Sequence, residues 1–146
     1  MKLIRSVNLS LFSKTGFIEK DKIALANILP EDAVVEQQTL PPELEGEIFT
    51  REITILTAKI TKSKSAEDFF LSLLKKMIRE DRRKLDETLK ERISDGTLYL
   101  RVEKEAALAG AIKLTYAGDS IHLKIKIAAY PKTDENVFNN MKELLK

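Results

Sequence analysis

IHLKIKI, residues 121–127, decides the fold, because apolar and polar side chains alternate along all of it. Successive side chains of a strand point to opposite faces of its sheet, so strict alternation indicates a strand with one buried face and one face in water. The apolar members are Ile121, Leu123, Ile125 and Ile127, and the polar members are His122, Lys124 and Lys126. We therefore expect a sheet that is covered on one side.

Further strands are predicted before this stretch and around it. TLYLRVEK (97–104) alternates in the same way, and residues 111–130 read as two strands joined by a turn. Residues 3–11 alternate as well, and residues 47–61 are rich in β-branched side chains. These segments would supply the strands of the sheet.

The amphipathic stretches predict helices. Residues 65–94 carry apolar side chains at helical spacing, and Asp81 falls among them, which predicts a break into two helices near residues 80–82. Shorter helices are expected over residues 19–29, which end at a proline, and over residues 133–146. All of these helices have one apolar face that can pack on the sheet.

The predicted order of elements is β-α-β-α-α-β-β-β-α. This order is typical of an α+β fold, with an antiparallel or mixed sheet and helices packed on one of its faces. We expect residues 1–146 to form one such domain, since a chain of this length can bury a core of its own. Residues 30–48 are expected to form a long irregular connection, with a brief extended piece around Val34 and Val35 followed by a Pro-Pro pair and Gly46.

The composition excludes several kinds of site. The chain has no Cys and a single His, His122, which rules out disulfides, thiolate metal sites and His-rich zinc sites. Its five Gly lack the spacing of a phosphate-binding loop. The lysines beside His122 make it a poor base, and Glu43, Glu45 and Glu47 lack the spacing of a calcium loop. We expect no catalysis, no metal and no cofactor.

The hydropathy pattern predicts a cytoplasmic protein without membrane contact. No run approaches the length of about 18 apolar residues that a spanning helix needs. The first residues, MKLIRSVNLSLF, are interrupted by polar side chains and lack the apolar core of a signal peptide.

Positive charge is concentrated in the later part of the chain. Residues 1–50 hold five of the 25 basic side chains, and the run KKMIREDRRK (75–84) alone holds six. Cations such as Arg79, Arg82 and Arg83 can neutralise phosphates whatever the base sequence, so this helix is a candidate RNA-binding surface. An ordinary solvated helix face has the same pattern.

The polar sides of two predicted strands form a second candidate surface. Tyr99 and Arg101 lie on one strand, and His122, Lys124 and Lys126 lie on the other. Aromatic rings and guanidinium planes stack on unpaired bases, and lysines bind phosphates. The two sets would form one patch only if the strands pair side by side, and a plain solvated sheet face remains the alternative.

The sequence also resembles a known family of archaeal RNA-binding proteins, described as predicted exosome subunits. The resemblance covers about residues 3–145, and LYLRVEKEAALAG (98–110) carries most of it. GEIFTREITILTAKI (46–60) and DSIHLKIKIAAYP (119–131) support it. It implies a domain similar to the fold of the ribosomal protein that carries 5S rRNA.

The resemblance implies a non-catalytic RNA-binding protein that works with the exosome or with ribosomal components. Carried over residue by residue, it selects Tyr99, Arg101 and Lys104 as RNA contacts. The alternative from another class is an adaptor that docks on a larger RNA-processing assembly through its acidic, proline-containing loop at residues 30–48.

Overall fold

The computed structural model describes residues 2–31, 33–40, 44–45, 48–49 and 52–146. The strands are β1 (Ile4–Lys14), β2 (Val35–Leu40), β3 (Leu44–Glu45), β4 (Ile48–Phe49), β5 (Ile53–Ile60), β6 (Ile93–Ser94), β7 (Thr97–Glu103) and β8 (Ser120–Ile127). The helices are α1 (Ile18–Ile28), α2 (Ser63–Lys76), α3 (Arg79–Glu87), α4 (Leu89–Arg92), α5 (Lys104–Leu108) and α6 (Asp134–Leu145).

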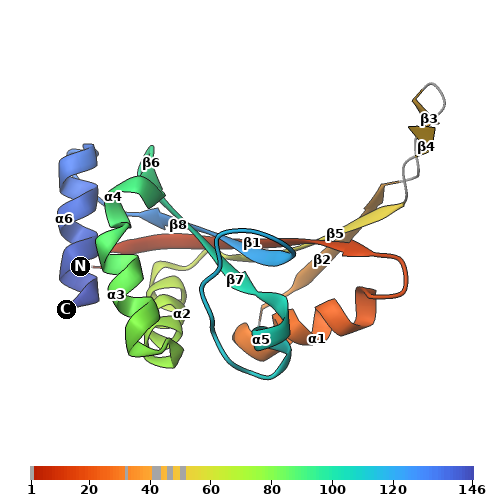
Figure 1. Cartoon of the computed structure of the whole chain (residues 1–146). Helices are drawn as coiled ribbons and strands as arrows, with labels where there is room; N and C mark the ends of the chain where they lie inside the picture. Colours follow the sequence, from red (N-terminus) through yellow and green to blue (C-terminus); the bar gives the residue numbers. More distant parts are fainter. Residues whose placement is uncertain (1, 32, 41–43, 46–47, 50–51) are drawn as a thin grey trace.

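Six strands form one antiparallel sheet in the order β2-β5-β1-β8-β7-β6. Helices α1, α2 and α5 lie below the strands in Figure 1, and α3, α4 and α6 gather at the end where both termini lie. The predicted α+β class is therefore confirmed, and the sheet is antiparallel rather than mixed. None of the helices in the described residues is long and apolar enough to cross a membrane.

The two faces of the sheet differ as the alternation predicts. On β8, the side chains of Ile121, Leu123 and Ile125 are fully or almost fully buried, whereas Lys124 and Lys126 are exposed. The buried side chains of β1, β5, β7 and β8 join those of the helices in one hydrophobic cluster. Every second residue of these strands is therefore held by the core, and the residues between them face away from it.

Strand β2 lies where the sequence predicts an irregular connection. Residues 35–40 pair with β5 from Ile53 to Ala58. The strand begins at the brief extended piece expected around Val34 and Val35, but it continues to Leu40, where the expectation of an irregular course is wrong. Glu36, Gln37 and Gln38 are all exposed, because an edge strand at this position buries neither of its faces. The segment therefore lacks the alternation that marks the central strands.

The predicted strand at the start of residues 111–130 is reduced to a few contacts. Residues 113 and 115 bond to the backbone of β7, through Glu103 N to Lys113 O at 2.9 Å and Thr115 N to Arg101 O at 3.0 Å. At the start of β7, Thr97 and Leu98 pair with β6, which is joined to β7 by the tight Asp95-Gly96 turn. The segment therefore has room for only a short pairing.

The predicted break in the long helical region is confirmed, but it lies earlier than expected. Helix α2 ends at Lys76 and α3 begins at Arg79. Asp81 is buried inside α3, where its Oδ2 accepts a hydrogen bond from the backbone N–H of Leu114 at 3.0 Å. Its place on the apolar side of the helix is explained by this bond rather than by a helix end.

Candidate nucleic-acid interface

Strands β7 and β8 bring the predicted sheet residues together. Tyr99 lies opposite Lys124, and Arg101 lies opposite His122. Side chains of directly opposed residues on one face stand about 5 Å apart. Because β7 and β8 pair side by side, which was the condition stated for a single patch, the two sets of residues form one patch.

Strands β1 and β5 extend this patch across the sheet. Asn8 of β1 lies opposite both Lys124 and Lys59, so Lys59, Asn8, Lys124 and Tyr99 form a row over four strands. With neighbouring strands about 4.8 Å apart, the row spans roughly 14 Å. We use the name polar face for the part of the outward surface of these four strands that is made by Ser6, Asn8, Ser10, Thr57, Lys59, Tyr99, Arg101, His122, Lys124 and Lys126; beyond it, the same side continues with apolar residues such as Phe12 and Ile53.

The polar face is rich in cations and poor in carboxylates. On these four strands, the row that contains Lys59 and the row that contains Arg101 hold no carboxylate; beside the cations they contain Asn8, Ser10, Thr57, Tyr99 and His122. Glu103, at the end of β7, is paired with Lys113 at 3.4 Å. The face therefore presents a positive field that its own acids neutralise little.

Two further cations border this face. Arg5 and Lys132 line a shallow hollow of about 590 Å³ together with Lys126 and the backbone turn at Gly96. Asp95 also lines this hollow. Sequence patterns missed Arg5, Lys59 and Lys132, because nothing local indicates that their segments lie beside Lys124 and Lys126.

The environment of His122 is cationic. Partial burial, then Arg101, then Lys124 lower the pKa of its imidazole below the ordinary value of 6.5. Each of these effects disfavours the protonated form. His122 is therefore neutral at pH 7, and an anion bound beside it would favour its protonation.

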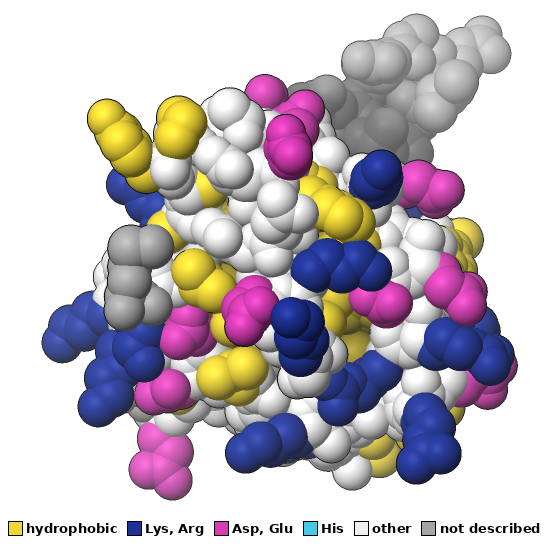
Figure 2. Space-filling model, turned by 90° about the vertical axis from the view of Figure 1, so that its left-hand side faces the viewer, with side chains coloured by type: hydrophobic (Ala, Val, Ile, Leu, Met, Phe, Trp, Pro, Cys, Tyr) yellow, Lys and Arg dark blue, Asp and Glu magenta, His cyan; other side chains and the backbone are white. Residues whose placement is uncertain are grey.

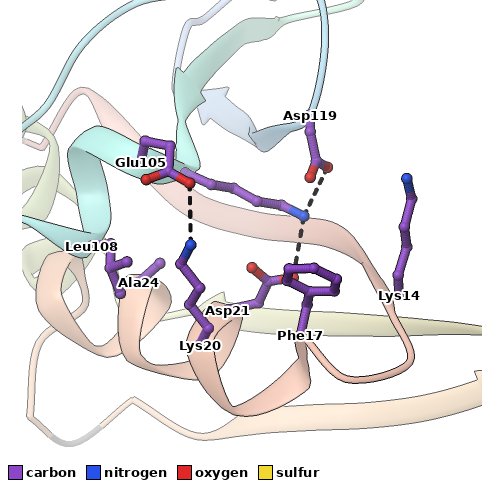
Figure 3. A pocket seen from close by; sticks show the side chains of 9 residues that line it. Lys14, Phe17, Lys20, Asp21, Ala24, Glu105, Leu108 and Asp119 are labelled. Carbon is purple, nitrogen blue, oxygen red and sulfur yellow. Dashed lines mark hydrogen bonds and ion pairs between the residues drawn. The ribbon is translucent and has the colours of Figure 1, made fainter.

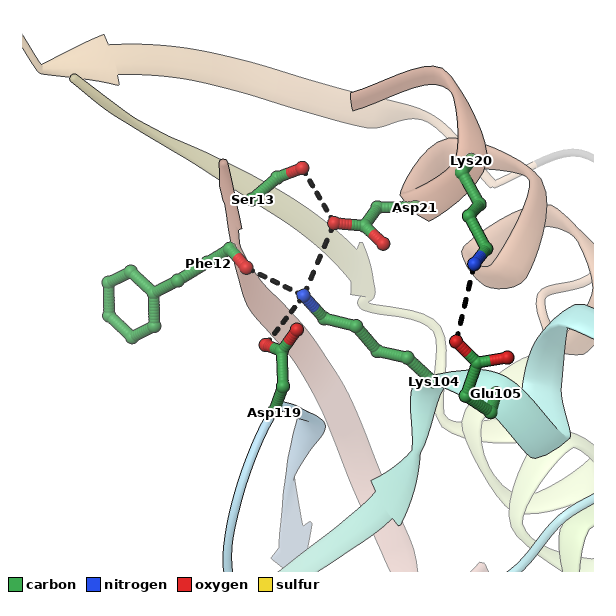
Figure 4. A network of polar contacts seen from close by, with 7 residues as sticks. All are labelled: Phe12, Ser13, Lys20, Asp21, Lys104, Glu105 and Asp119. Carbon is green, nitrogen blue, oxygen red and sulfur yellow. Dashed lines mark hydrogen bonds and ion pairs between the residues drawn. The ribbon is translucent and has the colours of Figure 1, made fainter. Parts of the chain in front are cut away.

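Lys104 is not part of the polar face. It begins α5 and is buried, and its Nζ donates to the Phe12 carbonyl oxygen at 2.7 Å (Figure 4). The same nitrogen lies 3.2 Å from Asp21 Oδ2 and 2.7 Å from Asp119 Oδ1. An ammonium group has three N–H donors, and all three have acceptors here. The resemblance implies a phosphate contact for Lys104, whereas in this structure its ammonium group contacts acceptors within the protein.

The Lys104 ion pairs lie in a hollow of about 220 Å³ between α1 and α5 (Figure 3). At its rim Lys20 pairs with Glu105 at 3.2 Å, which links the two helices a second time. Two of the three cations that line this hollow, Lys20 and Lys104, are thus held by carboxylates, and Lys14 is the third. The two paired lysines offer an RNA phosphate little free positive charge.

The basic helix is a separate surface. Helix α3, which carries Arg79, Arg82 and Arg83, follows α2 on the helix side of the sheet (Figure 1). Arg82 donates to the Leu145 carbonyl at 3.3 Å, and Arg83 lies 3.9 Å from Glu87. Blue and magenta side chains are interspersed over the end of the molecule that α3, α4 and α6 form (Figure 2). This mixture fits a solvated surface better than a phosphate track.

No group of three or more metal-binding side chains occurs among the residues that the structure describes. Glu43 and Glu47, two of the three glutamates weighed as ligands, lie outside those residues. The polar face therefore has the groups to bind anions and aromatic bases, and it has one weakly basic imidazole.

Comparisons with known proteins find similarity over most of the chain. A family model described as RNA binding matches residues 13–127. The chain is 33% identical over 131 residues to the RNA-binding protein PAB1135 of Pyrococcus abyssi, a match that covers 87% of this chain and 83% of the relative.

Solved structures share the fold over nearly the whole chain. Mth689, a DUF54 protein from Methanothermobacter thermautotrophicus, has a TM-score of 0.78 and 29% identity, with 99% of each chain covered. Protein SSO0741 from Sulfolobus solfataricus has a TM-score of 0.73 and 22% identity, with 96% of each chain covered. At the latter identity the likeness concerns the fold alone.

Proposed function

The chain belongs to the family described as RNA binding, and from this premise we propose that it binds RNA through its polar face without cleaving it. The observation that carries the proposal is the row of Lys59, Asn8, Lys124 and Tyr99 across four paired strands. Two exposed lysines and a half-exposed tyrosine stand there on a rigid sheet. This arrangement suits a sugar-phosphate backbone that crosses the strands.

Phosphate neutralisation would supply most of the affinity. Lys59, Lys124 and Lys126 are exposed and have no carboxylate partner among the described residues. Each cation that neutralises a phosphate releases counterions, so affinity falls as salt rises, with a slope of about 0.7 per phosphate on single strands. Arg101 adds a planar group that can hold a phosphate or stack on a base.

The chemistry of the face favours binding over catalysis. Hydrolysis of RNA needs a base and an acid, or a metal, near the scissile phosphate. His122 is the one imidazole of the chain, and a single imidazole with cationic neighbours supplies only one of these groups. Incubation of labelled RNA with the protein and Mg²⁺ should leave the RNA intact; cleavage that is lost in His122→Gln would overturn this point.

The proposal is tested by RNA affinity at several salt concentrations. The double variant Lys124→Ala, Lys126→Ala should bind more weakly and lower the log-log salt slope by about 1.4, from about 0.7 per lost contact. The matched double variant Arg79→Ala, Arg83→Ala removes two cations from α3 and should change neither value. If only the Arg79→Ala, Arg83→Ala variant bound RNA more weakly, the interface would lie on α3. If neither double variant changed RNA binding, neither surface would be the interface.

We further propose that the protein acts together with the exosome, and that its fold is similar to the ribosomal protein that carries 5S rRNA. Both rest on the resemblance of residues 98–110 to predicted exosome subunits. Cosedimentation of this protein with a purified archaeal exosome, with and without RNA, tests the association. Binding that needs RNA would point to a shared RNA, and binding without RNA to direct contact.

An adaptor role is the second candidate, and an apolar area near β2 favours it. Phe12 is 57% exposed, and Leu40 and Ile53, which oppose each other on β2 and β5, are 41% and 39% exposed. A deletion of residues 36–44 would test this role, but it would also remove most of β2. The double variant Leu40→Ser, Ile53→Ser is the better test, because it leaves the strand in place. It should weaken exosome binding and spare RNA affinity if this candidate holds.

A further inference from the structure

A second feature lies at the edge of the polar face, where β7 meets α4 and residues 115–116. A hollow of about 350 Å³ opens there, and its lining includes Tyr99, Arg101, His122 and Lys124 from the polar face. From outside the sheet it is lined by Arg92 and Tyr116, together with Thr115 and one carboxylate, Glu91. Arg92 lies in the predicted helical stretch 65–94 and Tyr116 in the predicted strands of residues 111–130, but neither pattern marks them as RNA contacts.

Tyr116 is fixed in position although most of its side chain is exposed. The residue is 59% exposed, and the Arg92 guanidinium carbon lies 5.0 Å from the centroid of its ring. Arg92 is itself anchored, because its Nε donates to Thr88 Oγ1 at 2.7 Å. Arg101 Nη1 donates to the Tyr116 carbonyl at 3.3 Å, which holds the backbone of the same residue.

These contacts prepare the ring for stacking. A cation against one side of an aromatic ring holds its plane, while the exposed part stays available to a second flat group. Tyr99, which is 44% exposed, lines the same hollow. The volume is near the lower end of the range for small-molecule sites, roughly 300 to 1,000 Å³, and so suits one nucleotide rather than a helix.

We propose that this hollow takes one unpaired nucleotide of the bound RNA, with its base stacked on Tyr116 and its phosphate near Arg101 and Lys124. The inference rests on the proposed function and adds that the RNA is single-stranded at this point. Bases inside a duplex are already stacked and paired, so their faces are closed to Tyr116. The positive groups of the hollow supply the charge that one phosphate needs.

The first test compares variants that differ in stacking. Tyr116→Leu should lower affinity for a short single-stranded RNA about 5- to 150-fold, the range for loss of one base stack, with an unchanged salt slope. Tyr116→Phe keeps the ring and should bind like the parent. Tyr130→Leu is the matched control, because Tyr130 is 97% exposed and does not line the hollow. A duplex of the same sequence should bind the parent and Tyr116→Leu equally.

The second test gives a signal that does not depend on a loss of affinity. The chain has no Trp, so Tyr116→Trp introduces a single indole whose fluorescence a stacked base would quench. Single-stranded RNA should quench it and the duplex should not, while Tyr130→Trp should respond to neither. Unfolding curves of the Tyr116 variants show whether each one is folded.

The outcomes separate this inference from the proposed function. If the parent binds no RNA, the proposed function fails. If it binds RNA but Tyr116→Leu matches Tyr130→Leu and the indole at 116 is not quenched, the hollow is not a base site, although the polar face still binds RNA. Equal quenching by duplex and single strand would also overturn the inference.

Discussion

Lys104 Nζ lies 2.7 Å from Asp119 Oδ1, and this ion pair joins the first residue of α5 to the residue that immediately precedes β8. The same nitrogen reaches Asp21 on α1, whose Oδ2 also accepts a hydrogen bond from the buried Ser13 hydroxyl at 2.6 Å. One lysine thus joins three segments that are far apart in the sequence. Because the group is buried, its loss affects stability rather than binding.

Lys104→Met should destabilise the fold by about 3–5 kcal/mol, because it leaves the buried Asp21 carboxylate without its cation. The urea midpoint measures this loss. Adding Asp21→Asn to Lys104→Met should recover part of the stability, since the uncompensated charge is then removed.

Lys20→Met is the matched control for Lys104→Met. Lys20 pairs with Glu105, but the side chains of this pair are 47% and 78% exposed, so its loss should cost under about 1 kcal/mol. If Lys104→Met were no more harmful than Lys20→Met and instead weakened RNA binding, Lys104 would belong to the interface.

His122 should make stability depend on pH near neutrality. Burial, Arg101 and Lys124 lower its pKa in the folded chain below the unfolded value near 6.5. Below that value the unfolded chain binds more protons than the folded one, so stability falls as pH decreases. Urea unfolding of the parent and His122→Gln between about pH 7.5 and 5 should show this dependence weaker in the variant.

RNA binding should have the opposite dependence. A phosphate near His122 would raise its pKa in the complex, so affinity should increase as pH falls through the lowered pKa. The same measurement on His122→Gln should show less change with pH. Identical pH profiles for the two proteins would place the phosphates away from this imidazole.

Asp81→Ala should destabilise the protein by about 1–3 kcal/mol, because the buried N–H of Leu114 loses its acceptor. Asp81→Asn keeps an acceptor oxygen and should lose less. The comparison variant Asp86→Ala removes a half-exposed carboxylate that pairs with Lys142 at the surface, and should change the urea midpoint little. Equal losses for Asp81→Ala and Asp86→Ala would contradict the role given to Asp81.

Lys59→Glu should weaken RNA binding and reduce the salt slope by at least about 0.7, since it removes one phosphate contact and adds repulsion. Lys75→Glu makes the same change on α2, on the helix side of the sheet, and should have a much smaller effect. Exposed substitutions of this kind usually alter stability by under about 0.5 kcal/mol, so affinity is the informative measurement. A larger loss in Lys75→Glu would transfer the interface to the helices.

The strands that alternate were predictable from the sequence, and those that do not were missed. The alternation of apolar and polar residues in β7 and β8 predicted both the buried face and the polar face, because successive side chains of a half-buried strand point in turn to the core and to solvent. Strand β2 was missed because Glu36, Gln37, Gln38 and Thr39 are all exposed, so the side chains on its two faces do not alternate between buried and exposed. Edge position is a tertiary property that leaves no local pattern.

The candidate site divides in the same way. Tyr99, Arg101, Lys124 and Lys126 could be grouped because each lies in a strand with a readable period. Lys104 was selected as an RNA contact by the resemblance. Its partners Asp21 and Asp119 could not be recognised from the sequence, because only folding brings these parts of the chain together.

The row across the sheet has a consequence for experiments with fragments. Lys59, Asn8, Lys124 and Tyr99 come from four strands. Strand β1, at the N-terminal end of the chain, carries Asn8 and lies between the strands that carry the two lysines. No peptide cut from the sequence contains this surface. RNA affinity is therefore a reporter of native structure, and in a urea titration it should disappear with the same midpoint as the fold.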